Sequence, residues 1–221
     1  MHVYLQERID VVPGQAERYL AEVERGWSHA KGLPRCVGAW RSTGAMGKWH
    51  EVYFLWEFDH WQHYCRVMDQ LAGHVGIASW ADPAWKLRVG GDSITLEPDS
   101  RSPSLASLTK MGLKAGLFMH EYIRVLPGKR QEYIDHYIDK FLPATRAAGR
   151  ELVGIWSMMH CANDVLILLA IKDWATHATG MGRRVGDSRR IGWQTSAPQV
   201  RTDYDMRLLL PGPKAMNPLS V

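Results

Sequence analysis

Hydrophobic and polar residues follow one pattern twice along this chain of 221 residues. In the first half, a β-rich stretch at residues 3–12 runs into a Pro-Gly pair. Proline pushes the residue before it toward extended geometry and is well tolerated in the first turn of a helix. The pattern therefore predicts a strand that ends there and a helix that carries Leu20, Val23 and Trp27 on one side.

Two strands, a helix and a last strand are predicted to complete this half. Residues 33–43 and 51–58 have strand composition, and the second stretch is apolar on both faces, as is typical of a central strand. Residues 59–71 are predicted to form a helix with Asp59 as its N-cap, and residues 85–98 a fourth strand. The order β-α-β-β-α-β is that of a ferredoxin-like unit.

The second half repeats the first. The decapeptide "VVPGQAERYL" (11–20) returns 114 positions later as "VLPGKRQEYI" (125–134), and changes of offset fall in loops, which tolerate insertions. Two similar halves of about a hundred residues are the economical interpretation. The further matched pairs are "VGAW" (37–40) with "VGIW" (153–156), "HEVYFLWEF" (50–58) with "NDVLILLAI" (163–171), and "WKLRV" (85–89) with "YDMRL" (204–208).

This repeat predicts the domain organisation and the fold class. We expect an N-terminal ferredoxin-like module at 1–97, a Ser- and Pro-rich linker at 98–113, a C-terminal module at 114–211 and a surface tail at 212–221. A four-stranded sheet with helices on one face leaves its other face bare. The predicted fold is therefore α+β, with two tandem ferredoxin-like (β-α-β-β-α-β) modules packed sheet to sheet as an intrachain dimeric α+β barrel.

Charge and composition exclude several classes of function. The formal net charge is +4 without a long Lys/Arg block, which argues against a nucleic-acid partner. No run of about 18 apolar residues indicates a membrane span, and the first residues lack the apolar core of a signal peptide, so we expect a cytoplasmic protein. Three cysteines without CxxC spacing argue against a disulfide scaffold and a zinc knuckle. Ten Trp and ten Met can line an apolar cavity as well as fill a core.

Residues 120–156, "HEYIRVLPGKRQEYIDHYIDKFLPATRAAGRELVGIW", resemble the NIPSNAP pattern, and the first half is a weaker copy of it. The wider superfamily, the dimeric α+β barrel, usually pairs two separate ferredoxin-like chains. It includes cofactor-free monooxygenases, polyketide cyclases, muconolactone-type isomerases and haem proteins. The resemblance thus implies the fold without selecting one activity. After "VGIW" the chain has "SMMHCAND" in place of the family's Gly-containing hairpin, which suggests a local specialisation.

Two glutamates, Glu7 and Glu121, occupy the same place in the repeat. Strand alternation puts each in a row of apolar side chains, where an unpaired carboxylate is costly and its pKa tends to rise. A carboxyl group with a raised pKa is a usable general acid or base near neutral pH. The alternative is a structural glutamate bonded to an arginine or to the backbone.

The strand of Glu121 carries His120 and Tyr122 on its opposite face, where the two halves differ in sequence. Histidine moves protons near neutral pH, and tyrosine can hold an enolate-like oxygen. His160 beside Cys161 forms a Cys/His pair at a predicted hairpin, although adjacent strand residues point to opposite faces. The catalytic candidates are therefore His120, Glu121, Tyr122 and His160, with a hydrogen-bonded interior histidine as the alternative.

A second set of residues is predicted to bind the substrate. Trp40, Trp56 and Trp156 lie on predicted strands and can form part of the wall of an apolar pocket between sheet and helices. Glu7 and His50, which are the first-half counterparts of residues in the catalytic set, complete this group.

The sequence favours a cofactor-independent enzyme that acts by proton transfer on a small apolar or aromatic metabolite. Isomerisation, cyclisation, dehydration, elimination and cofactor-free oxygenation all belong to this class. Two alternatives stay open: a non-catalytic ligand-binding or interaction module, and a haem-binding protein with an axial histidine. The expected partner is the small molecule, and association of the chain into a homo-oligomer stays open.

Overall fold

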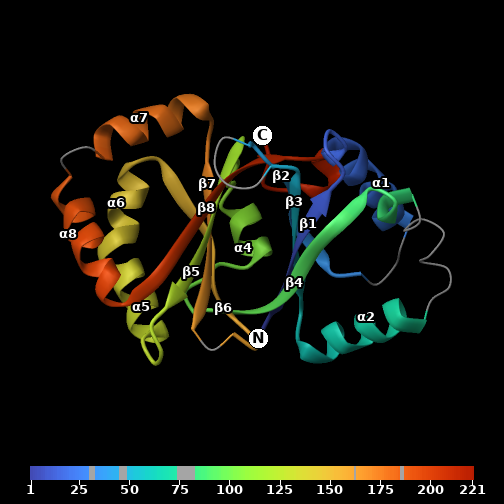
Figure 1. The fold of residues 1–221 in the computed structure, drawn as a ribbon, viewed down its shortest axis with the longest axis horizontal. Coiled ribbons are helices and arrows are strands. Elements are labelled where there is room, and N and C mark those ends of the chain that lie inside the picture. The colour runs from blue at the N-terminus through green and yellow to red at the C-terminus, as the bar shows by residue number, and fades with distance from the viewer. Residues whose placement is uncertain (30–32, 45–48, 74–82, 162, 185–186) are drawn as a thin grey trace. The chain divides into compact units, whose positions relative to one another are not determined.

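The computed structural model describes residues 1–29, 33–44, 49–73, 83–161, 163–184 and 187–221 (Figure 1). The chain divides into two compact units. The N-terminal module contains Met1–Glu97 together with Leu209–Ser220, and the C-terminal module contains Pro98–Leu208 together with Val221. The chain thus first passes from one unit to the other at the start of the segment predicted as the linker.

Each module has the strand and helix order that the sequence predicts. The elements of the first half are β1 (Val3–Val11), α1 (Ala16–His29), β2 (Arg35–Ser42), β3 (Glu51–Phe58), α2 (Trp61–Gly73) and β4 (Arg88–Pro98). Those that follow are α4 (Leu105–Lys110), β5 (Leu117–Val125), α5 (Arg130–His136), the π-helical turn η1 (Tyr137–Phe141), α6 (Leu142–Ala147), β6 (Arg150–Met158), β7 (Asp164–Ile171), α7 (Trp174–Arg184), α8 (Ser188–Ser196), η2 (Ala197–Gln199), β8 (Arg201–Pro211) and η3 (Lys214–Met216).

The strand order places the two most apolar strands at the centre of their sheets. The order is β4-β1-β3-β2 in the N-terminal module and β6-β7-β5-β8 in the C-terminal module. Strands β3 and β7 pair antiparallel with both neighbours, and every residue of each is buried. The predicted α+β class and the two ferredoxin-like modules are confirmed.

Helices cover one face of each sheet. In Figure 1, α1 and α2 lie on the same side of β1–β4, and α5–α8 lie on the same side of β5–β8. Apolar residues at helical spacing, among them Leu20 and Val23, join the core of the N-terminal module. No helix in the described part of the chain is long and apolar enough to cross a membrane.

Backbone hydrogen bonds correct the match at the end of the repeat. The amide of Val12 donates to the carbonyl of Leu87 at 2.8 Å, and the amide of Leu126 donates to the carbonyl of Val200 at 2.9 Å. Val12 and Leu126 are related by the offset of 114, so Leu87 corresponds to Val200 and the next residue, Arg88, corresponds to Arg201. The sequence-based match of residues 85–89 with residues 204–208 is therefore wrong.

The chain end packs into the N-terminal module and does not trail over the surface as expected. Met216 is fully buried within the core cluster of this module. The Asn217 side chain accepts from the amide of Ala39 at 3.0 Å and donates to the carbonyl of Ala39 at 2.8 Å. The last residues thus saturate backbone groups of β2 that would otherwise need another partner.

The segment predicted as a linker contains a short helix, α4. Ser104 caps this helix by accepting a hydrogen bond from the amide of Ser107. Leu105 and Leu108 are buried. The sequence did not predict this helix, because it is shorter than two turns and its apolar residues are too few to show a helical period within a Ser- and Pro-rich segment.

Candidate functional site

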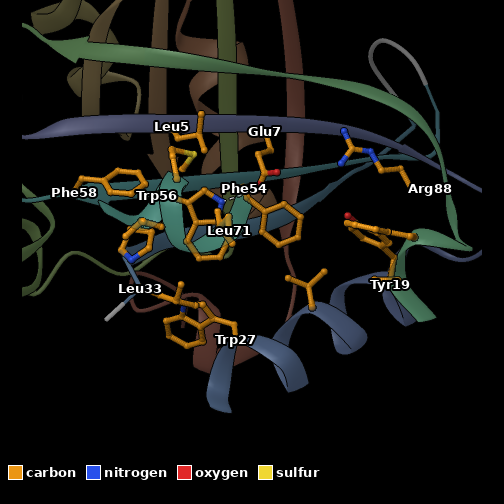
Figure 2. Close-up of a pocket in the computed structure, with 16 residues that line it drawn as sticks. Leu5, Glu7, Tyr19, Trp27, Leu33, Phe54, Trp56, Phe58, Leu71 and Arg88 are labelled. Carbon is orange, nitrogen blue, oxygen red and sulfur yellow. Dashed lines mark hydrogen bonds between the residues drawn. The ribbon is translucent and has the colours of Figure 1, made fainter. Parts of the chain in front are cut away.

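A cavity of about 180 Å³ lies between the sheet and the helices of the N-terminal module (Figure 2). Most of its lining is apolar or aromatic. Among the described residues of the lining, the charged ones are Glu7, from β1, and Arg88, from the start of β4. A concave, mainly apolar space with a few polar groups at one end is the usual form of a small-molecule site.

Simple periodicities bring the lining residues together. Alternation along β1 turns Leu5 and Glu7 to the same face, because successive strand side chains point to opposite sides. From α1, Tyr19, Val23 and Trp27 recur at a spacing of four residues, which keeps them on one helix face. The strand face and the helix face therefore meet across the cavity.

The carboxyl group of Glu7 is the chemical centre of the cavity. Trp56 Nε1 donates a hydrogen bond to Glu7 Oε2 at 2.7 Å. Burial raises the pKa of Glu7 above its ordinary value, and the Trp56 hydrogen bond and the positive charge of Arg88 oppose this rise only in part. Glu7 is thus a carboxyl group whose proton affinity is increased inside an apolar pocket.

Tyr19 and Arg88 lie beside Glu7 at one end of the cavity. Figure 2 shows the Tyr19 hydroxyl and the Arg88 guanidinium on the same side, both directed toward Glu7. Burial, and then the charge of Glu7, raise the pKa of Tyr19 to about 12, while Arg88 acts in the opposite direction. Tyr19 therefore keeps its proton at neutral pH and can donate a hydrogen bond.

Aromatic rings form the rest of the wall. Phe54 and Trp56 stack with centroids 5.7 Å apart and an interplanar angle of 7°, and Trp27 lies 6.4 Å from Trp56. Two further lining residues, Leu71 and Trp85, are 40% and 58% exposed. These two side chains therefore contact both the cavity and solvent.

The C-terminal module repeats the polar triplet in another setting. Glu121, Tyr133 and Arg201 correspond to Glu7, Tyr19 and Arg88. Glu121 is 3% exposed and accepts hydrogen bonds from the hydroxyls of Tyr204 at 2.8 Å and of Tyr137 at 3.5 Å. This carboxylate thus accepts hydrogen bonds from two tyrosines, whereas Glu7 accepts one from Trp56 and lines the cavity.

Two of the predicted substrate-binding residues, Glu7 and Trp56, line the cavity, whereas the predicted residues Trp40 and Trp156 do not. Trp40 is buried, and its ring covers Gly38 so closely that a Cβ added to this glycine would lie 2.0 Å from it. Trp156 packs in the same way against Gly154, with a corresponding distance of 2.3 Å. Both rings belong to the protein core.

The predicted histidines lie in turns or on the other face of the sheet. His50 and His160 have positive φ angles, 69° and 64°, and occupy corresponding turns before β3 and β7. His160 is exposed, and neither residue lines the cavity. His120 is buried on β5, and the Tyr122 hydroxyl donates to Asp164.

The four catalytic candidates are therefore not gathered at one point. Glu121 alternates with His120 and Tyr122 along β5 and so faces the other side of the sheet. The cavity of the N-terminal module contains none of them. No group of three His, Cys, Asp or Glu side chains suited to a metal ion occurs among the residues that the structure describes.

Sequence reasoning did not assign a role to Tyr19, Trp27 or Arg88. The match of Tyr19 with Tyr133 in the repeat was the available signal for the first of them. The sequence signal for Arg88 is the match of Leu87-Arg88 with Val200-Arg201. Two residues are too few to recognise from sequence, and the backbone hydrogen bonds reveal the match.

No family model and no curated protein matches this chain. Among solved structures, it is similar to a "putative monooxygenase" from Lactobacillus acidophilus, with 11% identity, coverage of 95% of this chain and 93% of the other, and a TM-score of 0.63. An anthrone oxidase-like protein gives 8% identity, coverage of 95% and 91%, and a TM-score of 0.65. A NIPSNAP-like domain protein from Burkholderia xenovorans has 21% identity, covers 47% of this chain and 90% of its own, and gives a TM-score of 0.41. At these identities the likeness to the first two structures shows the fold: over 95% of its length, this chain shares their α+β architecture.

Proposed function

We propose that the N-terminal module contains the active site of a cofactor-independent enzyme. This enzyme would catalyse proton transfer to and from a compact aromatic substrate. The observation that carries this proposal is the position of Glu7, a carboxyl group of raised pKa that faces a cavity walled by aromatic rings. A carboxylate with increased proton affinity is a stronger base than one in water.

The size of the cavity supports a small substrate. Its volume is about 180 Å³. A dry apolar cavity of about 150 Å³ suffices to hold benzene. One aromatic ring with a short substituent, or a compact bicycle, matches this space, and the ring would lie against Trp27 and Trp56.

The polar end of the cavity supports enolisation as the chemical step. The Glu7 carboxylate would take a proton from a carbon atom next to a carbonyl group. The negative charge that develops on the carbonyl oxygen would be stabilised by the Arg88 guanidinium and by a hydrogen bond from Tyr19. Return of the proton to another atom completes an isomerisation, and loss of a leaving group completes an elimination.

Oxygenation is a possible continuation of the same first step. One protein of similar fold is named a "putative monooxygenase" and another an "anthrone oxidase-like protein". A carbanion formed at Glu7 that adds O₂ and takes up a proton would give a hydroperoxide. Consumption of O₂ is therefore a second readout for any substrate that undergoes proton exchange.

The two other functions considered from sequence find less support in the cavity. A haem-binding site would need room for a macrocycle much larger than benzene, and the cavity volume is about 180 Å³. A non-catalytic binding module fits the aromatic wall equally well, but it does not explain why the carboxyl group of Glu7 is buried in the cavity.

The test uses 1-indanone and 2-indanone, compact bicyclic ketones with acidic C–H bonds, as probes in D₂O. We expect the protein to accelerate deuterium incorporation, measured by proton NMR, and Glu7→Gln to reduce this rate at least about 100-fold, since general acid–base catalysis contributes roughly that much. The control is Glu17→Gln, an exposed glutamate at the start of α1, which should leave the rate unchanged. Binding without exchange would leave the binding module as the function, and neither binding nor exchange would refute an aromatic ketone site.

A further inference from the structure

Helix α8 of the C-terminal module buries a single side chain, that of Trp193. Trp193 is 5% exposed, while the residues on both sides of it, Gly192 and Gln194, are exposed. Its ring stacks on Phe141 with centroids 5.0 Å apart and an interplanar angle of 20°. The helix is thus attached to the module mainly through one indole ring.

A cage of aromatic side chains from the preceding helices surrounds this ring. Besides Phe141, the ring contacts Tyr133 and Tyr137, at centroid distances of 5.4 and 5.7 Å. His136 meets it edge-on at 5.3 Å. All four lie on α5 or on the π-helical turn η1, and such turns are frequent at functional sites.

The cage corresponds to the wall of the cavity in the other module. By the offset of 114, Tyr133, Tyr137 and Phe141 match Tyr19, Val23 and Trp27. These last three residues line the cavity beside Glu7. In its own module, Trp193 therefore occupies the place that the cavity occupies in the N-terminal module.

The polar end of the site is also repeated. Glu121 and Arg201 act on Tyr133 as Glu7 and Arg88 act on Tyr19: the glutamate charge raises the pKa of the tyrosine and the arginine lowers it. The C-terminal module thus contains both the aromatic wall and the polar triplet of a ligand site. By the offset that relates Leu87 to Val200, Trp193 corresponds in sequence to Trp80, which lies outside the described residues.

We propose that the C-terminal module contains a second aromatic-binding site, which Trp193 fills as a built-in occupant. The ligand class that this site accepts when Trp193 is absent is a planar, neutral bicyclic aromatic of the size of indole, stacked on Phe141. The glutamate of this site, Glu121, accepts hydrogen bonds from Tyr204 and Tyr137. We therefore propose ligand binding there and no proton transfer, so the proposal does not depend on catalysis at Glu7.

The test removes the indole ring and supplies it again from solution. In the full chain, Trp193→Ala should lower the Tm by about 10 °C, as expected for truncating a buried tryptophan in a protein of this size. Free indole should then bind with one more molecule per chain than in the wild type, measured by isothermal titration calorimetry, and should recover part of the lost Tm. The matched control is Trp174→Ala, a 48% exposed tryptophan on α7, which should neither lower the Tm appreciably nor create a site.

Two further outcomes decide the proposal. If Trp193→Ala lacks a cooperative unfolding transition, indole must restore one, and Trp193→Leu, which leaves a smaller space, must gain a site for benzene. Folded variants that bind no additional ligand, or an unfolded variant that indole does not rescue, would overturn it. Because the readout is the number of molecules bound and not turnover, Glu7→Gln should leave the gained site intact, so this proposal and the proposed function can fail separately.

Discussion

Trp56 donates its indole hydrogen to the carboxylate of Glu7 across 2.7 Å, although neither residue is the direct cross-strand partner of the other. In the β1–β3 ladder, Leu5 pairs with Trp56 and Glu7 pairs with Phe54, so the bond runs diagonally on one face of the sheet. A shift of this register by one residue would turn Glu7 away from the cavity. The position of the proposed base is therefore a consequence of strand pairing.

Glu7 should make the stability of the protein depend on pH. Its folded-state pKa is raised above the ordinary value of 4.5 by burial. The contribution of Glu7 to stability is therefore fully present below the unfolded pKa and is lost as the pH rises through the folded pKa. We expect Glu7→Gln to be more stable relative to the wild type at pH 8 than at pH 4, as measured by urea unfolding. A relative stability that falls with rising pH would contradict a folded-state pKa of Glu7 that burial raises.

Replacing Trp56 with phenylalanine should weaken Glu7 as an acid. Trp56→Phe keeps an aromatic ring in the wall but removes the hydrogen bond that lowers the pKa of Glu7. We expect the limb of the pH–rate profile that reports Glu7 to move upward by about one pH unit, since a hydrogen bond to a charged group contributes about 1.5–3 kcal/mol. The control is Trp61→Phe, an exposed residue at the start of α2. An unchanged profile in both variants would remove Trp56 from the site.

Filling the cavity from α1 should weaken ligand binding while preserving the fold. Val23 lines the cavity at the position where the C-terminal module has Tyr137. Val23→Trp should weaken the binding of an indanone probe at least about tenfold, because the added ring occupies the space of the ligand, and 10-fold corresponds to about 1.4 kcal/mol. Calorimetric titration measures the affinity, and a circular dichroism melt checks the fold. Val23→Ala, which enlarges the cavity, should still bind, and undiminished binding in Val23→Trp would place the ligand elsewhere.

The buried chain end should contribute measurably to stability. Asn217→Ala removes the bonds of its side chain to the amide and carbonyl of Ala39 and to the carbonyl of Pro213. Because buried polar groups left without partners are costly, we expect the free energy of unfolding to fall by about 2–4 kcal/mol. Lys214→Ala, an exposed change three residues earlier, should have little effect in the same denaturant titration. Equal stability of the two variants would mean that the tail is dispensable.

Local patterns were sufficient to predict the repeat, the element order and the central strands. Runs such as "EVYFLWEF" and "DVLILLAI" are apolar on both faces, and only a strand with a partner on each side and cover on both faces can bury them. Strand alternation likewise placed Glu7 in an apolar row and the Trp56 ring near a pocket wall. These features depend on periods of two and 3.6 residues, which are present in the sequence itself.

The sequence by itself determined that two similar modules exist and that each carries a glutamate in a row of apolar side chains along its first strand. Only the tertiary structure decided that Glu7 faces an open cavity while Glu121 is bonded to Tyr204 and lies in a module filled by Trp193. Likewise, only folding placed Arg88 beside Glu7 and Met216 in the core of the first module. The physical reason is that space is filled by side chains from distant segments. Periodicity along the chain reports which face of an element is apolar, but not which distant residue comes to cover that face.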